Sequence, residues 1–364
     1  MLDIAEAKLR PSPAELRTPN AERRTANAER RTPNTKHVVR QRQKTDIATR
    51  FHWVDRVKAA TACYSKEELH LVGVSGGVDS RVLLHLLPMI GFRHLVVCHL
   101  NHNLRGDESL EDGRFVYRLS HRLGLPLYAE TLAELPRTGS LEGAAREARL
   151  QFFARAAAIF STSSVFLAHQ ADEQVETFLF NLFRGSGPLD NAAIKPESLV
   201  TVGPRQLMLR HPLLQVWKDE ICEFAAAFRL KFREDSTNLS RRMIRNRIRH
   251  DLIPEIERLM DRSIKPALLR TIEIAGKEGE FVRSQVPVME SKAELAIREL
   301  RKLPVAIQRR TIHDWLRNND IEDCGFDEIE GVRSLLTRLE IAKINLPRGA
   351  FCRRRAGRLF IQFP

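Results

Sequence analysis

The chain has 364 residues, of which 43% are hydrophobic, and a formal net charge of +13 at neutral pH. This length allows two domains with real cores, and the charge favours a polyanionic partner, most simply a nucleic acid. Five scattered cysteines without a C-x-x-C pair argue against a zinc ribbon, and the lack of an apolar leader or a membrane-length apolar stretch predicts a protein of the reducing cytoplasm.

Residues 1–48 contain a seven-residue repeat that begins at Arg17, Arg24 and Arg31. The repeat has no apolar seam, and Pro19 and Pro33 would interrupt a helix, so it is not a coiled coil. A polar, charged segment without core residues is expected to be disordered. We predict a basic extension that the activity does not need.

Apolar runs alternate with helical patterns from residue 49 to about residue 262. Near-continuous apolar strands between helices predict a parallel sheet covered on both faces, in a Rossmann-like, doubly wound α/β domain. The expected strands are Leu69–Val74, His94–Leu100, Pro126–Glu130 and Ser164–Ala168, and the expected helices are Ser80–Leu87, Ser109–Leu123, Leu141–Ile159 and Asp172–Arg184. Ligands bind beyond the carboxyl ends of such strands, so Ser75, His99 and His169 should converge on one crevice.

The most informative segment joins the first strand to the first helix and reads Ser75, Gly76, Gly77, Val78, Asp79, Ser80. Two glycines let backbone N–H groups turn toward an anion, and the helix N-terminus and the serine hydroxyls add further donors. No Gly-Lys-Ser/Thr follows, so this is not a Walker A loop. A carboxylate beside phosphates makes sense with a divalent cation between them, so Asp79 points to Mg²⁺.

Two basic segments follow. His99–Arg105 ends the second strand with two histidines and an arginine, which can meet a base or a phosphate; a solvated loop is the alternative. Arg146 and Arg149 share a helix face at a spacing of three residues, which suits paired contacts to an anion. A salt-bridged surface face would give the same spacing.

The segment from His169 to Thr177 places Asp172 and Glu176 four residues apart, so both carboxylates face the same way. They repel each other unless a cation lies between them, either Mg²⁺ or the ammonium of an amino acid. Asp172 at a helix start is alternatively only a cap. The helix runs on to Arg184.

A capped turn at Glu234–Asn238 leads into an arginine-bearing helix that contains Arg245 and Arg249. Such a helix suits phosphate contacts from RNA or from ATP, and a solvated basic helix is the alternative. Residues 263–364 are predicted to form a small, mostly helical C-terminal domain that ends in two short strands, Lys343–Leu346 and Leu359–Phe363.

In this order, the segments from residue 51 to about 262 resemble the tRNA(Ile)-lysidine synthetase family, whose PP-loop cleaves ATP between the α- and β-phosphates. The family pattern is a PP-loop, a His-x-Asn-His-x-Leu-Arg segment, an Ala-Arg-x-x-Arg helix, an acidic helix that ends in Arg-Gly-Ser-Gly, a Pro-Leu-Leu turn and an Arg-Asn-x-x-Arg run. The chain departs from it at Gln170, Glu173 and His211, where the family has His, Asp and Arg.

The resemblance implies a two-step ligation. ATP adenylates O2 of the wobble cytidine in a tRNA(Ile) with a CAU anticodon, releasing pyrophosphate, and the ε-amine of L-lysine then attacks C2 and expels AMP. It implies that Asp79 holds Mg²⁺, that Asp172 and Glu176 bind lysine or deprotonate its amine, and that His169 and Arg146 stabilise the intermediate. The implied ATP-binding residues are Ser75, Gly76, Gly77, Val78, Asp79, Ser80 and His99, and the implied RNA or phosphate contacts are Arg105, Arg149, Arg184, Arg245 and Arg249.

Three other functions share parts of this pattern. A PP-loop tRNA thiolation enzyme would need a catalytic cysteine pair or cluster ligands, and the cysteine spacing offers neither. A synthetase that amidates GMP or NAD precursors would leave the arginine-rich segments without a role. A non-catalytic RNA-binding relative with an idle nucleotide fold is the alternative outside the enzymes, although the complete PP-loop speaks against it.

Overall fold

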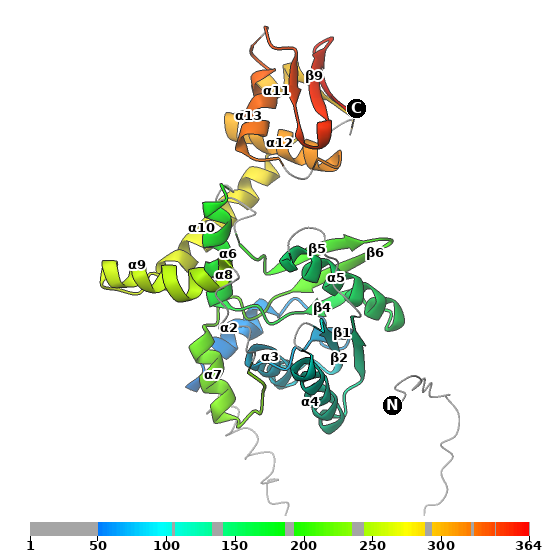
Figure 1. The fold of residues 1–364 in the computed structure, drawn as a ribbon, viewed down its shortest axis with the longest axis vertical. Helices are drawn as coiled ribbons and strands as arrows, with labels where there is room; N and C mark the ends of the chain where they lie inside the picture. Colours follow the sequence, from blue (N-terminus) through cyan, green and yellow to red (C-terminus); the bar gives the residue numbers. More distant parts are fainter. Residues whose placement is uncertain are drawn as a thin grey trace, which may run out of the picture. The chain divides into compact units, whose positions relative to one another are not determined.

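The computed structural model describes residues 50–103, 106–132, 141–185, 193–234, 244–287, 293–321, 324–338 and 340–363. The predicted basic extension, Arg105 and most of the capped turn therefore lie outside the described residues. Two sheets, each with its own buried core, organise the rest of the chain (Figure 1).

The larger sheet has six strands in the order β3-β2-β1-β4-β6-β5. Its strands are β1 (Leu69–Gly73), β2 (His94–Asn101), β3 (Leu127–Thr131), β4 (Ser164–Phe166), β5 (Glu197–Val202) and β6 (Arg205–Arg210). The four predicted strands run parallel, which confirms the doubly wound fold class, and β6, which the sequence analysis did not predict, runs parallel to β4. The structure adds an antiparallel edge strand, β5, which a two-residue turn with Gly203 at φ +54° joins to β6.

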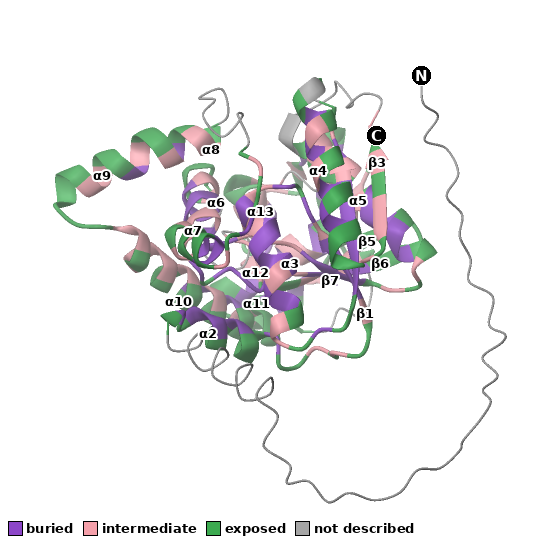
Figure 2. Ribbon diagram, turned by 90° about the horizontal axis from the view of Figure 1, so that it is seen from below, coloured by how far each residue is buried: buried purple, intermediate pink, exposed green. Residues whose placement is uncertain are grey.

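Helices cover both faces of this sheet. The helices are α2 (Trp53–Ala60), α3 (Val78–Met89), α4 (Asp107–Leu123), α5 (Leu141–Ile159) and α6 (Ala171–Phe183). Right-handed crossovers through α3 and α4 lead in one direction along the sheet and place both helices on one face, whereas α5 returns and covers the other. There Phe152 and Phe153 pack with Leu71 and Val96 in a cluster with little or no exposed surface. Figure 2 marks the buried stretches of these strands and helices in purple.

A helical segment follows the sheet. Its elements are α7 (Lys218–Ala227), α8 (Ile244–Arg247), a π-helix η2 (Ile248–Leu252), α9 (Ile253–Met260) and α10 (Lys265–Ser284). Ile248 and Ile253 join a core cluster with Val175 and Phe178 of α6, and Leu268 of α10 packs against it. The predicted arginine-bearing helix is therefore anchored on α6, through a π-turn of the kind that often marks functional sites.

The smaller sheet has four antiparallel strands in the order β7-β10-β9-β8. Its strands are β7 (Glu294–Ala296), β8 (Lys343–Asn345), β9 (Phe351–Arg355) and β10 (Arg358–Gln362), and its helices are α11 (Ile297–Lys302), α12 (Val305–Asn318) and α13 (Phe326–Ser334). Fully buried Trp315 and Ile312 of α12 pack with Leu359 of β10 in its core. The predicted small helical domain thus also contains a complete sheet.

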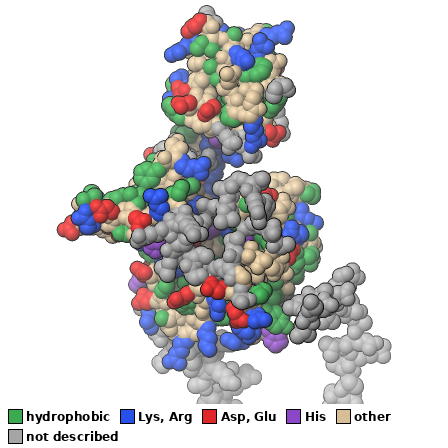
Figure 3. All heavy atoms as spheres, in the orientation of Figure 1, with side chains coloured by type: hydrophobic (Ala, Val, Ile, Leu, Met, Phe, Trp, Pro, Cys, Tyr) green, Lys and Arg blue, Asp and Glu red, His purple; other side chains and the backbone are tan. Residues whose placement is uncertain are grey.

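No helix in the part of the chain that the structure describes is both long enough and apolar enough to cross a membrane. Basic and acidic side chains are interspersed over the face shown in Figure 3. The net positive charge is therefore not gathered into one continuous patch on that face.

Candidate active site

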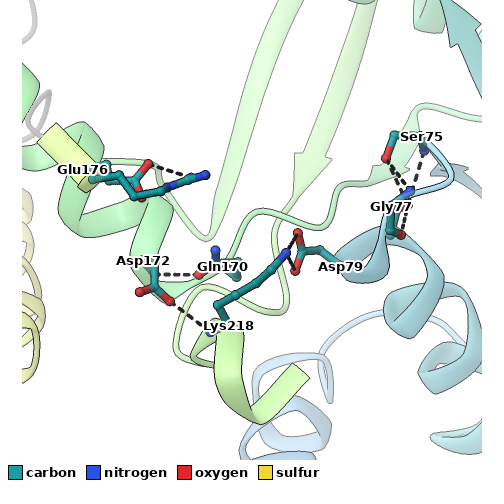
Figure 4. A network of polar contacts seen from close by, with 9 residues as sticks. Ser75, Gly77, Asp79, Gln170, Asp172, Glu176 and Lys218 are labelled. Carbon is teal, nitrogen blue, oxygen red and sulfur yellow. Dashed lines mark hydrogen bonds and ion pairs between the residues drawn. The ribbon is translucent and has the colours of Figure 1, made fainter. Parts of the chain in front are cut away.

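The PP-loop lies where β1 ends and α3 begins. Gly76 has φ +101°, in the left-handed region that favours glycine. The Gly77 N–H donates to Ser75 Oγ over 3.2 Å, and the Ser80 hydroxyl donates to the Gly77 carbonyl over 3.0 Å (Figure 4). Hydroxyl groups at both ends therefore fix the loop at the positive end of the α3 dipole, where an anion is stabilised.

A cavity of about 370 Å³ opens at the carboxyl ends of β1, β2 and β4. Its lining includes Ser75, Asp79, His99, Arg149, His169 and Glu173. The predicted convergence of Ser75, His99 and His169 is confirmed, although these residues come from three different strand ends. Lining groups from both the PP-loop and the α6 helix make this cavity the place where a nucleotide and a second substrate could meet.

Four buried polar atoms around this cavity have no hydrogen-bond partner among the described residues: His99 Nε2, His102 Nδ1, His169 Nδ1 and Glu173 Oε2. We call these residues the unpartnered set. Buried polar atoms in native proteins are nearly always paired, and each exception requires an explanation. Four exceptions around one cavity indicate that a polar ligand completes them.

The charge states of the unpartnered set suit a polar ligand. Burial lowers the pKa of His102 to about 4 and that of His169 well below its ordinary value, so both rings are neutral at physiological pH. Burial, reinforced by the nearby Asp79 and Glu176 carboxylates, raises the pKa of Glu173 to about 7. A carboxyl group with this pKa can both release and accept a proton near neutral pH.

The other carboxylates of the site are already matched with cations of the same chain. Lys218 Nζ lies 2.7 and 2.9 Å from the two carboxylate oxygens of Asp79 (Figure 4). Lys265 Nζ lies 2.7 Å from Asp172 Oδ1, and the Lys218 backbone N–H donates to Asp172 Oδ2 over 2.9 Å.

Glu176 has the same kind of partner. Its side chain is only 4% exposed, and Arg249 binds both of its oxygens, at 2.6 and 2.9 Å. We refer to Asp79, Asp172 and Glu176 as the paired carboxylates. In place of the single cation expected between Asp172 and Glu176, each carboxylate has a separate side-chain partner, Lys265 or Arg249, and Arg249 faces a carboxylate and not a phosphate in this structure.

Two of the departures from the family pattern have a local explanation. The Gln170 side chain caps α6, because its Oε1 accepts the Asp172 N–H over 2.6 Å. The cap is therefore Gln170 and not Asp172. The His211 ring contacts the His169 ring in a tilted arrangement, with centroids 4.8 Å apart and planes 44° from parallel, and its Nδ1–H donates to the Lys195 carbonyl over 2.8 Å.

The predicted arginines differ in their surroundings. The charges of Arg146, Arg149 and Arg245 all contribute to the lowered pKa of His169, so these three lie around that ring. Arg184 is exposed at the end of α6, with its guanidinium 5.2 Å from the centre of the Phe180 ring. Arg146 and Arg149 are exposed as well, so they differ from Arg184 in their electrostatic effect on His169 and not in their exposure.

The sequence reasoning missed Lys218, Lys265 and the open carboxylate of Glu173. Lys218 contacts Asp79 across 139 positions of sequence, and Lys265 contacts Asp172 across 93. No local spacing reports such contacts. The sequence does place Glu173 close to two other carboxyl residues, Asp172 and Glu176. Position in the helix does not show which of these three carboxylates has no side-chain cation among the described residues.

Comparisons with known proteins agree with this geometry. Residues 49–256 match a family described as a PP-loop domain, and residues 295–360 match one described as the TilS substrate binding domain. The tRNA(Ile)-lysidine synthase of Geobacter sulfurreducens is 36% identical over 296 residues, which cover 76% of this chain and 61% of the relative. That of Thermosynechococcus vestitus is 32% identical over 280 residues, which cover 73% of this chain and 78% of the relative.

A third relative, the tRNA(Ile)-lysidine synthase of Solibacter usitatus, is 32% identical over 274 residues, which cover 72% of this chain and 60% of the relative. The chain spans about three fifths of the length of the Geobacter and Solibacter proteins. The PP-loop match covers more than half of the chain, and the motifs occur in the order that the resemblance requires. This chain belongs to the tRNA(Ile)-lysidine synthase family.

Proposed function

We propose that this protein joins L-lysine to C2 of the wobble cytidine in a CAU-anticodon tRNA(Ile), with conversion of ATP to AMP and pyrophosphate. The observation that carries the proposal is the cavity itself. It joins a PP-loop to four buried polar groups that have no partner among the described residues. A site for nucleotide binding alone would not need an open carboxyl group with a pKa near neutrality.

The PP-loop supports the ATP half of the reaction. Its N–H groups and the α3 dipole suit the phosphates, and the 24% exposed Asp79 side chain lines the same cavity. No group of three or more His, Cys, Asp or Glu side chains within the described ranges could hold a metal alone. This fits Mg²⁺ that arrives with the nucleotide, because Mg²⁺ is usually held by one or two carboxylates plus substrate phosphates. When bound, Mg²⁺ would neutralise charge on the departing pyrophosphate.

The histidine and arginine groups support the cytidine half. In the first step, cytidine O2 forms a bond to the α-phosphorus, and the bond from that phosphorus to pyrophosphate breaks. Neutral His169 can donate or accept a hydrogen bond at the adenylated base, and Arg146 and Arg149 supply positive charge beside it. The base must leave its stack to reach this cavity.

Glu173 is the carboxylate best placed to act on the amine. The ε-ammonium of lysine has an ordinary pKa near 10.4 and cannot attack until it loses a proton. With a pKa near 7, Glu173 can take that proton; the nitrogen then bonds to C2, and AMP departs with the former O2 atom. Asp172 and Glu176 remain candidates to bind lysine, but each would first have to part from Lys265 or Arg249.

The smaller sheet supports contact with RNA. The register of β8, β9 and β10 places four basic residues with Phe351 on the face away from the buried core: Lys343, Arg353, Arg355 and Arg358. Lys343 Nζ lies 4.2 Å from the centre of the Phe351 ring, and Glu294 pairs with Arg358 at 2.6 Å. Such a face suits phosphate contacts, as expected for a domain that holds a tRNA.

The test incubates the full chain with ATP, radiolabelled L-lysine and a CAU-anticodon tRNA(Ile). The proposal predicts label in the RNA and an equal amount of AMP. A thiolation enzyme, an amidating synthetase and a non-catalytic RNA-binding protein all predict RNA without label. The same tRNA with a GAU anticodon serves as the matched control, because it lacks the target cytidine.

A further inference from the structure

Lys218 is the first residue of α7, and hydrogen bonds fix its backbone in place. The Val216 carbonyl accepts the Ala171 N–H over 2.9 Å, and the Lys218 N–H donates to Asp172. The Trp217 N–H donates to the Glu220 side chain over 2.8 Å and thereby closes the first turn of α7. The start of α7 is therefore hydrogen-bonded to the start of α6, and the Lys218 side chain extends from there to Asp79 (Figure 4).

The contact between Lys218 and Asp79 bridges both carboxylate oxygens, yet the two side chains remain 40% and 24% exposed. A partly exposed pair of this kind contributes little to stability. The position of the pair is more informative than its contribution to stability. Asp79 lines the cavity at the PP-loop, where the phosphates are expected.

A divalent cation and an ammonium group that share one carboxylate repel each other, so a cation at Asp79 would weaken the contact with Lys218. Once Asp79 turns to a cation that arrives with ATP, the Lys218 ammonium needs another anion. The fixed start of α7 limits its reach to the same crevice, where the polyphosphate supplies one.

We propose that Lys218 is a phosphate-binding residue that occupies Asp79 in the free protein and moves to the β- and γ-phosphates when ATP binds. The inference rests on the proposed use of ATP by this site. Lys218 would keep Asp79 neutralised until the nucleotide brings its own cation. It would then stabilise the negative charge that grows on pyrophosphate as the bond to the α-phosphorus breaks.

The test compares Lys218→Gln with the wild-type chain in two binding experiments that need neither tRNA nor lysine. Without nucleotide, Mn²⁺ titration followed by electron paramagnetic resonance should show about fivefold tighter binding to the variant, because the competing ammonium is gone. With Mg²⁺ present, calorimetry should show about tenfold or greater loss of ATP affinity, because a charged contact to phosphate is missing.

Lys66→Gln is the matched control, since Lys66 Nζ donates to the Thr61 carbonyl and lies over the Phe92 ring, so its removal exposes neither Asp79 nor Asp172. It should leave Mn²⁺ binding at the wild-type level. Thermal unfolding of both variants checks that they fold. Equal ATP affinity in the Lys218→Gln variant and the wild type would overturn the proposal, and so would Mn²⁺ binding that does not tighten.

A pyrophosphate-release assay with tRNA keeps this proposal separate from the proposed function. If the wild type releases no pyrophosphate but both binding shifts occur, the ligation reaction is wrong and the role of Lys218 stands. If the wild type is active and neither shift occurs, the ligation stands and Lys218 is only an ion-pair partner.

Discussion

The unpartnered set and the paired carboxylates lie in neighbouring parts of one site, yet they differ in how far the protein satisfies them. His99, His102, His169 and Glu173 line the cavity, and each has a buried polar atom without a hydrogen-bond partner among the described residues. Asp79, Asp172 and Glu176 each have a cation of the same chain within 2.9 Å. All seven residues have titratable side chains, so residue type alone does not distinguish the two groups.

The difference separates two tasks. A buried polar atom without a partner is destabilising, and it persists where a ligand will complete it. A carboxylate with its own cation is already stabilised and holds elements together, unless a stronger cation displaces the first. The unpartnered set therefore indicates where a ligand could bind. Asp172 and Glu176 instead join α6 to α10 and to η2. Asp79 shares features of both groups, because it has a side-chain cation and also lines the cavity.

The largest effect is expected from Asp79→Ala. This change removes the carboxylate that faces both Lys218 and the proposed cation, so tRNA-dependent pyrophosphate release should fall by about a thousandfold or more. A stopped-flow phosphate assay coupled to pyrophosphatase measures it, and circular dichroism checks the fold. Wild-type rates in this variant would refute the role given to Asp79.

Gly76→Ala should reduce ATP affinity by about tenfold or more, because an added Cβ at φ +101° strains the loop whose N–H groups are proposed to hold phosphate. Gly91 has φ +106° with open space around it and lies outside the cavity lining, so Gly91→Ala is the matched control. Both variants should lose about 1 kcal/mol of unfolding free energy, but only the first should lose ATP binding in calorimetry. Equal ATP affinities would show that the loop geometry does not matter.

Glu176→Gln tests a paired carboxylate. It leaves the partly buried Arg249 guanidinium without its counter-charge, so the free energy of unfolding in urea should fall by about 2 kcal/mol. Glu255→Gln removes a comparable ion pair with Arg258 that is fully exposed and should leave the unfolding midpoint unchanged. If both variants behave alike, Glu176 does not hold α6 to η2.

Glu173→Gln tests the unpartnered set through pH. The folded protein keeps the Glu173 proton up to about pH 7, because burial raises the pKa of this carboxyl group from its ordinary value of 4.5 to about 7. The raised pKa therefore favours folding below pH 4.5, and this contribution is lost as the pH rises through 7. The variant should be more stable than the wild type by about 3 kcal/mol at pH 8 and close to it at pH 4, as measured by urea unfolding.

The control for this prediction is Glu147→Gln, which changes an exposed carboxylate on α5. Its stability relative to the wild type should be the same at both pH values. An equally pH-independent result for Glu173→Gln would mean that its carboxyl group is not held in a desolvated position.

The smallest effect is expected from removal of residues 1–48. The repeat carries no motif that the site uses, so lysine incorporation should stay within about twofold of the full chain. Filter binding of tRNA measures the other possible role of the segment. A large loss in either assay would assign the repeat to RNA binding.

Local patterns predicted most of the fold. The apolar runs next to Ser75, His99 and His169 predicted the parallel sheet and the crevice. Short runs of residues determine where strands end, so this part of the fold can be read from the sequence. Neither β5 nor β6 was predicted, since both are short strands whose polar residues leave part of each strand exposed, as in a loop.

The site was less predictable than the fold. The spacing of Asp172 and Glu176 predicted one shared cation, but each carboxylate has its own side-chain partner, Lys265 or Arg249, which nothing nearby in the sequence indicates. Tertiary contacts decide which carboxylate has no ion-pair partner among the described residues, and in this structure it is Glu173. Its role could not be read from helix periodicity alone.

The central claim is that this crevice turns a cytidine oxygen into a leaving group. The most direct measurement supplies tRNA(Ile) whose wobble cytidine carries ¹⁸O at O2, together with ATP and L-lysine, and determines the mass of the released AMP. The account predicts AMP that contains one ¹⁸O atom for each lysine joined to the RNA. Lysine incorporation with unlabelled AMP, or with the ¹⁸O recovered in water, would contradict it.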